Sequence, residues 1–141
     1  MCVTCNTHEG ESFVPEGLGR PDDGSSPSAG FNSSEASFHN WLTGFLPGLS
    51  AREIELVKRH YPPRGATETG ESYEGAYARA GMIYRDVVLA CPAYLIAKAA
   101  GTSSWVTEYT ISPAKHASDT YRVSIYHQGI IESLFCRTRA G

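Results

Sequence analysis

The middle of the chain repeats apolar residues with the period of a helix. Four large apolar side chains stand at i, i+3, i+4 and i+7, the spacing of one helical face: Phe38, Trp41, Leu42 and Phe45. Ser33 or Ser34 can cap the start of this helix, and Pro47–Gly48 ends it. The pattern therefore predicts an amphipathic helix between these two boundaries.

A second amphipathic helix is expected directly afterwards, in the segment SAREIELVKRHYPP. Ser50 and Glu53 have the spacing of a capping box, in which each side chain accepts a backbone N–H from the other residue. Pro62–Pro63 stops the helix. Three of its apolar residues face one way: Ile54, Val57 and Tyr61. Both helices are predicted at the periphery, where the aromatic residues between positions 38 and 61 offer a surface for binding.

The next segment predicts two more helices. Over residues 73 to 89, tyrosine, alanine and valine side chains follow one stripe of a helix. Gly81 lies inside this helix and costs about 1 kcal/mol relative to alanine. Pro92 is expected to begin a separate helix as its N1 residue, and Gly101 is expected to end it.

Short strands are expected on either side of these helices. CVTC near the N-terminus is apolar and partly β-branched, and residues 105 to 111 alternate apolar and polar side chains. Between the first strand and the helices, residues 15 to 30 have the composition of a surface loop. Two strands joined through helices form a crossover connection, which requires parallel strands. The fold class is therefore α/β, with an incomplete parallel sheet and several helices between its two strands.

Composition and charge narrow the possible partners. The chain has 141 residues, which suits one domain, and a formal net charge of -3. This acidic balance gives no reason to expect nucleic acid or an anionic membrane as a partner. No apolar run approaches the roughly 20 residues that a membrane span requires. The N-terminal segment MCVTCNTHEG lacks the basic and apolar regions of a signal peptide, so the location of the chain stays open.

The cysteines do not predict a metal site or a cofactor. Cys2 and Cys5 form a C-x-x-C pair, and the other two cysteines lie far away in sequence, at Cys91 and Cys136. A zinc site would need about four ligands in close clusters, and no second tight cluster of Cys or His is present. A redox motif would open a helix after a strand, whereas CVTC has the composition of the strand itself.

One N-glycosylation sequon is present, at Asn32-Ser33-Ser34. It can be modified only in a secretory setting. Sequons also arise by chance, so the motif alone does not assign a location.

Two loops carry candidate catalytic groups. His8-Glu9-Gly10 follows the first strand, and His116 follows the last one. Loops at the carboxyl ends of parallel strands are where α/β enzymes place reactive groups. A carboxylate there can accept the imidazole N–H and fix its tautomer, so that the imidazole can take a proton from a nucleophile.

Three segments match one family pattern in the same order along the chain. NTHEGESFVP resembles N-x-x-E-G-x-x-F-V, with matches at Asn6, Glu9, Gly10, Phe13 and Val14. YRDVVLACPAYLIAKAA resembles D-x-x-x-x-C-P followed by a helix, with matches at Asp86, Cys91 and Pro92. TEYTISPAKHASD resembles a strand that contains a tyrosine, followed by P-x-x-H-x-x-(D/E), with matches at Tyr109, Pro113, His116 and Asp119. Residues 3 to 120 thus resemble type-B carboxylesterases, the cholinesterase and lipase family of α/β-hydrolases, and their secreted fungal branch in particular.

The resemblance implies roles for individual residues. It makes Glu9 the acid and His116 the base of a Ser–His–acid triad, with an ester as the substrate of the parent enzyme. It makes Asp119 a structural support near the histidine and Asp86 a buried hydrogen-bonding residue. Residues 1–120 would form the C-terminal part of a type-B carboxylesterase domain, and residues 121–141, which depart from the family, a divergent tail.

The nucleophile of that family is missing from this chain. It is a serine in G-x-S-x-G, and no such pentapeptide occurs; the glycine-rich oxyanion segment is absent as well. In α/β-hydrolases the serine precedes the acid and the acid precedes the histidine. The chain therefore resembles the C-terminal fragment of a serine carboxylic-ester hydrolase and is expected to be inactive and poorly soluble alone. The alternative is a non-catalytic binding or pairing module derived from that domain; its oligomeric state stays open.

Overall fold

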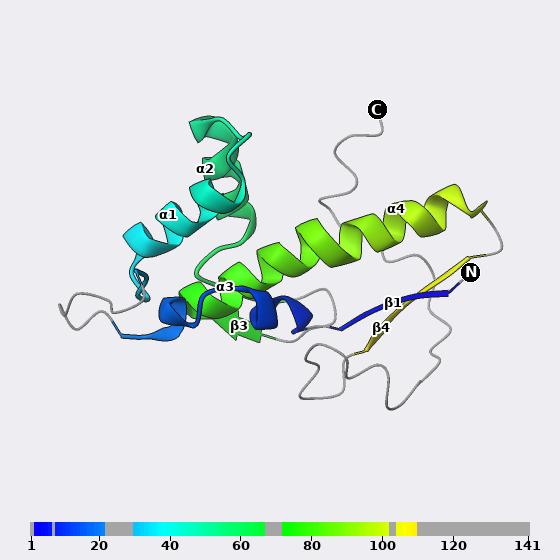
Figure 1. The fold of residues 1–141 in the computed structure, drawn as a ribbon, viewed down its shortest axis with the longest axis horizontal. Helices are drawn as coiled ribbons and strands as arrows, with labels where there is room; N and C mark the ends of the chain where they lie inside the picture. Colours follow the sequence, from blue (N-terminus) through cyan, green and yellow to red (C-terminus); the bar gives the residue numbers. More distant parts are fainter. Residues whose placement is uncertain (1, 7, 22–29, 67–71, 102–103, 110–141) are drawn as a thin grey trace.

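One long helix dominates the computed structural model (Figure 1). It is continuous from Gly75 to Ala99. Three elements succeed one another along it: α3 (Gly75–Tyr84), the π-helical segment η3 (Arg85–Ala90) and α4 (Cys91–Ala99). The structure describes residues 2–6, 8–21, 30–66, 72–101 and 104–109.

The continuous helix differs from the two helices predicted from the sequence. Pro92 lies in the first turn of α4 as expected, but the chain does not break before it. A proline inside an α-helix lacks an N–H and clashes with the carbonyl one turn earlier. The wider π turns of η3 come directly before Pro92 and change the register of the carbonyls at that point. Gly101, with a φ of 69°, follows the end of α4 as predicted.

The helix predicted to begin at residue 73 begins at Gly75. Tyr73 lies in β3 (Ser72–Glu74), which pairs antiparallel with β2 (Arg64–Ala66). The Tyr73 side chain is buried in the core, as the apolar stripe predicted, but it belongs to a strand and not to the helix. Three-residue strands are too short to leave a period in the sequence.

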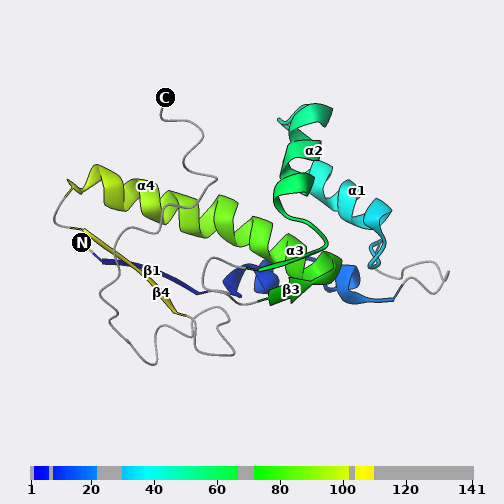
Figure 2. The same cartoon turned by 180° about the vertical axis from the view of Figure 1, so that it is seen from behind.

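A parallel pair of strands lies along α4. β1 (Cys2–Asn6) pairs with β4 (Trp105–Tyr109), with Cys2 opposite Trp105 and Asn6 opposite Tyr109. Figures 1 and 2 show the pair from opposite sides, with α4 running over one face of it. The carboxyl ends of both strands therefore meet at one edge. That this pair is part of a larger parallel sheet stays a prediction.

The two amphipathic helices have the caps that the sequence predicted. α1 (Glu35–Phe45) begins after Ser34, whose side chain accepts a hydrogen bond from the Ser37 N–H. α2 (Ala51–His60) begins with the capping box, in which the Glu53 carboxylate accepts the Ser50 N–H at 2.8 Å. These local signals placed the start of α2 and left that of α1 open between Ser33 and Ser34, of which the structure has Ser34.

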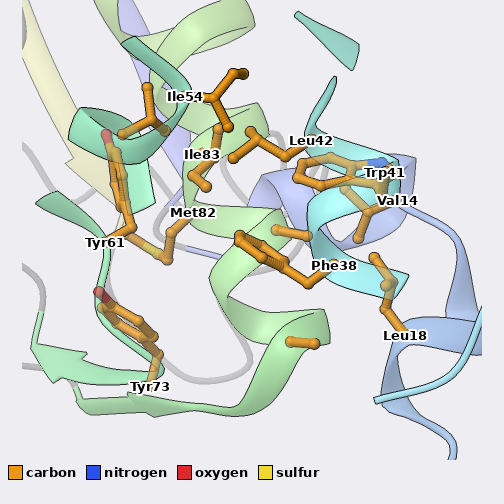
Figure 3. Packing of buried hydrophobic residues seen from close by; sticks show 13 residues of the cluster. Val14, Leu18, Phe38, Trp41, Leu42, Ile54, Tyr61, Tyr73, Met82 and Ile83 are labelled. Carbon is orange, nitrogen blue, oxygen red and sulfur yellow. The ribbon is translucent and has the colours of Figure 1, made fainter. Parts of the chain in front are cut away.

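The core joins α1, α2 and α3 with the N-terminal segment (Figure 3). Phe38, Trp41 and Tyr61 are buried in it and Phe45 is partly buried, so these aromatic residues belong mainly to the core and not to the binding surface that the sequence suggested. The expected loop at residues 15 to 30 contains the short 3-10 helix η2 (Glu16–Gly19), and positions 22–29 lie outside the described residues. The core cluster consists of Val14, Leu18, Phe38, Trp41, Leu42, Ile54, Val57, Tyr61, Tyr73, Ala76, Ala80, Met82 and Ile83.

Arg79 of α3 ties the other two helices to the core. Its guanidinium donates to the Glu35 carboxylate at 2.8 Å and to the Lys58 carbonyl at 3.0 Å, and also bonds the Tyr61 carbonyl. It lies 3.9 Å from the centre of the Phe38 ring. Arg79 is only 2% exposed, so a buried cation binds the start of α1 and the end of α2 to α3. Cations are favourable at helix C-termini because the last carbonyls carry partial negative charge.

The continuous helix is also a candidate membrane span, which the two shorter helices predicted from the sequence were not. From Gly75 to Ala99 it is long and apolar enough to cross a membrane by length and composition. Core helices of soluble proteins pass the same test, and several residues of α3 are buried against the rest of the chain. The expectation of no membrane span stays a prediction.

Candidate functional site

Glu9 is a buried carboxylate at the tip of β1. It is the first residue of the 3-10 helix η1 (Glu9–Phe13) and comes three positions after Asn6, the last residue of β1. Its side-chain Oε2 accepts the backbone N–H of Asn6, the final residue of β1, at 3.1 Å. Glu9 is 8% exposed. A carboxylate held this way is fixed over the end of the strand.

A close backbone approach fixes the turn that carries Glu9. A Cβ at Gly10 would lie 1.9 Å from the Gly81 carbonyl oxygen and 2.7 Å from the Arg85 nitrogen. A Cβ at Gly81 would lie 2.7 Å from Cγ of Glu11. Real Cβ atoms essentially never show contacts under 3.0 Å, so a side chain at either position requires a shift, and at Gly10 the atoms that would have to move belong to the backbone of α3 and η3. The glycine after Glu9 and the glycine inside α3 are therefore two halves of one contact between η1 and α3.

Side chains around η1 hold it in place from other directions. His8 Nδ1 lies 3.0 Å from Glu11 Oε1, and the Tyr77 hydroxyl donates to the Glu11 carbonyl at 2.7 Å. Phe13 stacks on Tyr84, with ring centroids 5.2 Å apart and planes 13° apart. The sequence did not predict these contacts, because each joins η1 to α3 or closes within a turn that has no periodic signal.

His116 lies outside the described residues. The last described residue before it is Tyr109, which is opposite Asn6 in the ladder. The structure therefore brings the end of β4 next to the strand that leads into Glu9, and it leaves the position of the imidazole untested. Asp119, Cys136 and the tail at residues 121–141 also lie outside the described residues.

Asp86 is a buried hydrogen-bonding residue, as the resemblance implied. Its Oδ2 accepts the Tyr61 hydroxyl at 2.6 Å, and its Oδ1 accepts the Arg85 Nε–H at 2.9 Å. Both members of the Arg85–Asp86 ion pair are about one-tenth exposed. The pair lies in the first turn of η3 and faces the end of α2, so it stabilises the packing of α2 on the long helix.

Replacing Tyr61 with phenylalanine tests this contact. We expect the free energy of unfolding to fall by about 1.5–3 kcal/mol, because a buried hydrogen bond to a charged group is lost. The loss should be measured by urea unfolding at neutral pH. Tyr94→Phe on α4, a half-buried position, is the matched control and should change stability by less than about 0.5 kcal/mol. Equal losses in the two variants would contradict the assignment.

The same variant should change the pH dependence of stability. Burial, and secondly the charge of Asp86, raise the pKa of Tyr61 far above its ordinary value. Tyrosine in an unfolded chain titrates near about 10. Because the folded pKa is the higher one, the contribution of this phenol is complete below about pH 10 and is lost as the pH rises beyond it. Tyr61→Phe should therefore lose less stability than the wild type between about pH 10 and 11.

No candidate metal centre is present in the part of the chain that the structure describes. Among those residues there is no group of three or more His, Cys, Asp or Glu side chains that could hold an ion. Cys2 and Cys5 lie in β1, and their side chains are not among the described ones. The C-x-x-C pair is part of a strand, as its composition predicted.

The chain has a distant similarity to a carboxylesterase. The chain is similar to the carboxylesterase patB of Penicillium expansum, with 28% identity over 103 residues. That alignment covers 72% of this chain and 18% of the carboxylesterase. No protein-family model matches the chain, and no solved structure matches it. The similarity is thus a distant one to a single segment of a carboxylesterase, and the chain spans less than a fifth of that relative's length.

Proposed function

We propose that this chain is the C-terminal part of a serine carboxylic-ester hydrolase with the type-B, α/β-hydrolase fold. In that enzyme Glu9 is the triad acid, His116 is the triad base, and the nucleophilic serine lies in a part of the enzyme that this chain does not contain. The observation that carries the proposal is the buried Glu9 carboxylate at the end of β1, beside a parallel β4 that leads toward His116.

Chain geometry allows the two groups to meet. Neighbouring strands lie about 4.8 Å apart, and the carboxyl ends of β1 and β4 share one edge. His116 comes seven positions after Tyr109. An extended segment of this length reaches roughly 23–25 Å, which is ample for a loop that turns back over the strand ends. The acid is already held in place by the Asn6 N–H and by the contact between Gly10 and Gly81.

Each group then has a defined role in ester hydrolysis. The His116 imidazole removes the proton from the serine hydroxyl as it attacks the ester carbonyl, and returns it to the leaving alcohol. Glu9 accepts the other imidazole N–H, fixes the tautomer and stabilises the imidazolium. A carboxylate has about four acceptor sites, so the bond from the Asn6 N–H leaves capacity for the imidazole. Water then releases the acyl group by the same proton path.

The two-stranded sheet also supports the fragment proposal. Parallel sheets normally have more strands and helices on both faces, and α4 covers one face of the β1–β4 pair. On the long helix, three large apolar side chains are exposed: Val88 at 40%, Leu95 at 56% and Ile96 at 54%. Both the strand edges and these side chains would be covered in a complete hydrolase domain. A second candidate is a non-catalytic pairing module. The same exposed apolar side chains favour it over a monomeric domain, because a partner would cover them.

Activity separates these candidates. We expect the isolated chain to hydrolyse a short-chain nitrophenyl ester no faster than its own His116→Ala variant, because it has no nucleophilic serine. We expect a chimera, in which this chain replaces the aligned segment of the Penicillium expansum carboxylesterase, to hydrolyse the same ester. Turnover by the isolated chain that is lost in His116→Ala would contradict the proposal. A folded chimera without activity would favour the pairing module.

A further inference from the structure

The sequon Asn32-Ser33-Ser34 lies at the surface, immediately before α1. Ser33 is exposed, and so are Glu35 and Ala36 at the start of the helix. Asn32 and Ser34 are half-buried. It is the only Asn-x-Ser/Thr motif in the 141 residues, and Ser33 is not the proline that would disable it.

The two polar side chains that define the motif are held together in the folded chain. The Ser34 hydroxyl donates to Asn32 Oδ1 at 2.6 Å, and the Ser34 backbone N–H donates to the same oxygen at 3.2 Å. The Ser37 hydroxyl also donates to it, at 2.7 Å. These bonds all use the carbonyl oxygen of the Asn32 amide. A sugar on Nδ2 would leave that oxygen as an acceptor, so these three bonds can persist after modification.

We propose that Asn32 is an acceptor site for N-linked glycosylation when the chain enters a secretory pathway. The donor is a lipid-linked oligosaccharide pyrophosphate. The bond between the sugar C1 and the pyrophosphate oxygen breaks, a bond from C1 to Nδ2 of Asn32 forms, and the displaced amide proton passes to a base of the transferase. Nothing is oxidised or reduced. The proposal is independent of the esterase assignment.

The test separates the motif from its structural role as a helix cap. The full chain is expressed in yeast behind a secretion signal, as wild type and with Ser34→Thr or Ser34→Asp. Threonine keeps both the sequon and the cap, whereas aspartate keeps the cap and destroys the sequon. The readouts are the endoglycosidase-sensitive band shift and the mass of the peptide containing residue 32, in membrane and secreted fractions.

We expect one glycan on the wild type and on Ser34→Thr, and none on Ser34→Asp. Because transfer is scored in the membrane fraction as well, poor secretion of any variant does not obscure the result. Unmodified Asn32 in wild-type chain that has entered the membrane fraction would overturn the proposal. A glycan that persists in Ser34→Asp would overturn it as well.

Discussion

Replacing His116 with alanine in the chimeric carboxylesterase will lower kcat by roughly a millionfold, the effect of losing one principal member of a serine–histidine–acid unit. The serine cannot be deprotonated without the imidazole, and the leaving alcohol receives no proton. Glu9→Gln should cost less, about ten thousandfold, because the imidazole remains but its tautomer is wrong. Both losses should appear in kcat more than in KM, since neither group is needed to bind the ester.

The measurement is the steady-state hydrolysis of a short-chain nitrophenyl ester by purified chimeras. His39→Ala is the matched control: His39 lies in α1, and its backbone carbonyl accepts the Thr43 hydroxyl, a bond that the substitution keeps. It should retain activity within about twofold, as most substitutions away from a site do. A His116→Ala chimera within about tenfold of the parent would contradict the assigned role of the histidine.

Gly10→Ala will disrupt the turn that carries Glu9. The added Cβ would lie 1.9 Å from the Gly81 carbonyl oxygen, and backbone atoms on both sides leave it no flexible neighbour to displace. Overpacking a core typically costs 1–3 kcal/mol, and a clash with backbone belongs at or above the top of that range, at about 3 kcal/mol. Either η1 separates from α3 or the helix shifts, and both changes move the carboxylate.

Gly44→Ala is the control for this substitution. Gly44 is exposed in α1, and a Cβ there would have nothing within 4 Å. Alanine should therefore stabilise the helix by up to about 1 kcal/mol. Stability is followed by urea unfolding of the chain with tryptophan fluorescence, and activity by the chimera assay. A Gly10→Ala chain as stable as the wild type would show that η1 and α3 do not approach as closely as described.

Local signals in the sequence predicted the parts of the fold that depend on neighbouring residues. Ser34 caps α1, and Ser50 with Glu53 forms the capping box of α2, because both devices close within three residues. The apolar stripe of α1 identified Phe38 and Leu42, which are fully buried. The same signals mark where each helix begins, but they do not specify what its face packs against.

The remaining features depend on contacts between distant segments. From the sequence, Gly81 is expected only to lower the stability of the helix. In the structure its lack of a side chain allows η1 to lie against α3. Arg79 reads as a polar residue on a helix, yet it is buried between α1 and α2. The π turns of η3 allow the helix to continue through Pro92, and no periodic pattern in the sequence predicts them.

The candidate site was predictable only in part. The place of Glu9 at the end of a strand was predictable, and the structure shows that it is buried there. Its role as a triad acid stays a prediction that rests on the resemblance to type-B carboxylesterases. The contacts of His8, Tyr77 and Phe13 that hold its turn were not predictable, since they involve α3. The role of His116 stays a prediction that rests on the resemblance and on the direction of β4.

A double-mutant cycle on the chimera tests most directly whether Glu9 and His116 act together. The kcat/KM of the parent chimera is compared with those of Glu9→Gln, His116→Ala and the combination. If the two side chains form one unit, the double variant will be no slower than His116→Ala alone, because the carboxylate acts only through the imidazole. If the two losses multiply, the residues act independently, and the convergence of acid and base at the ends of β1 and β4 is wrong.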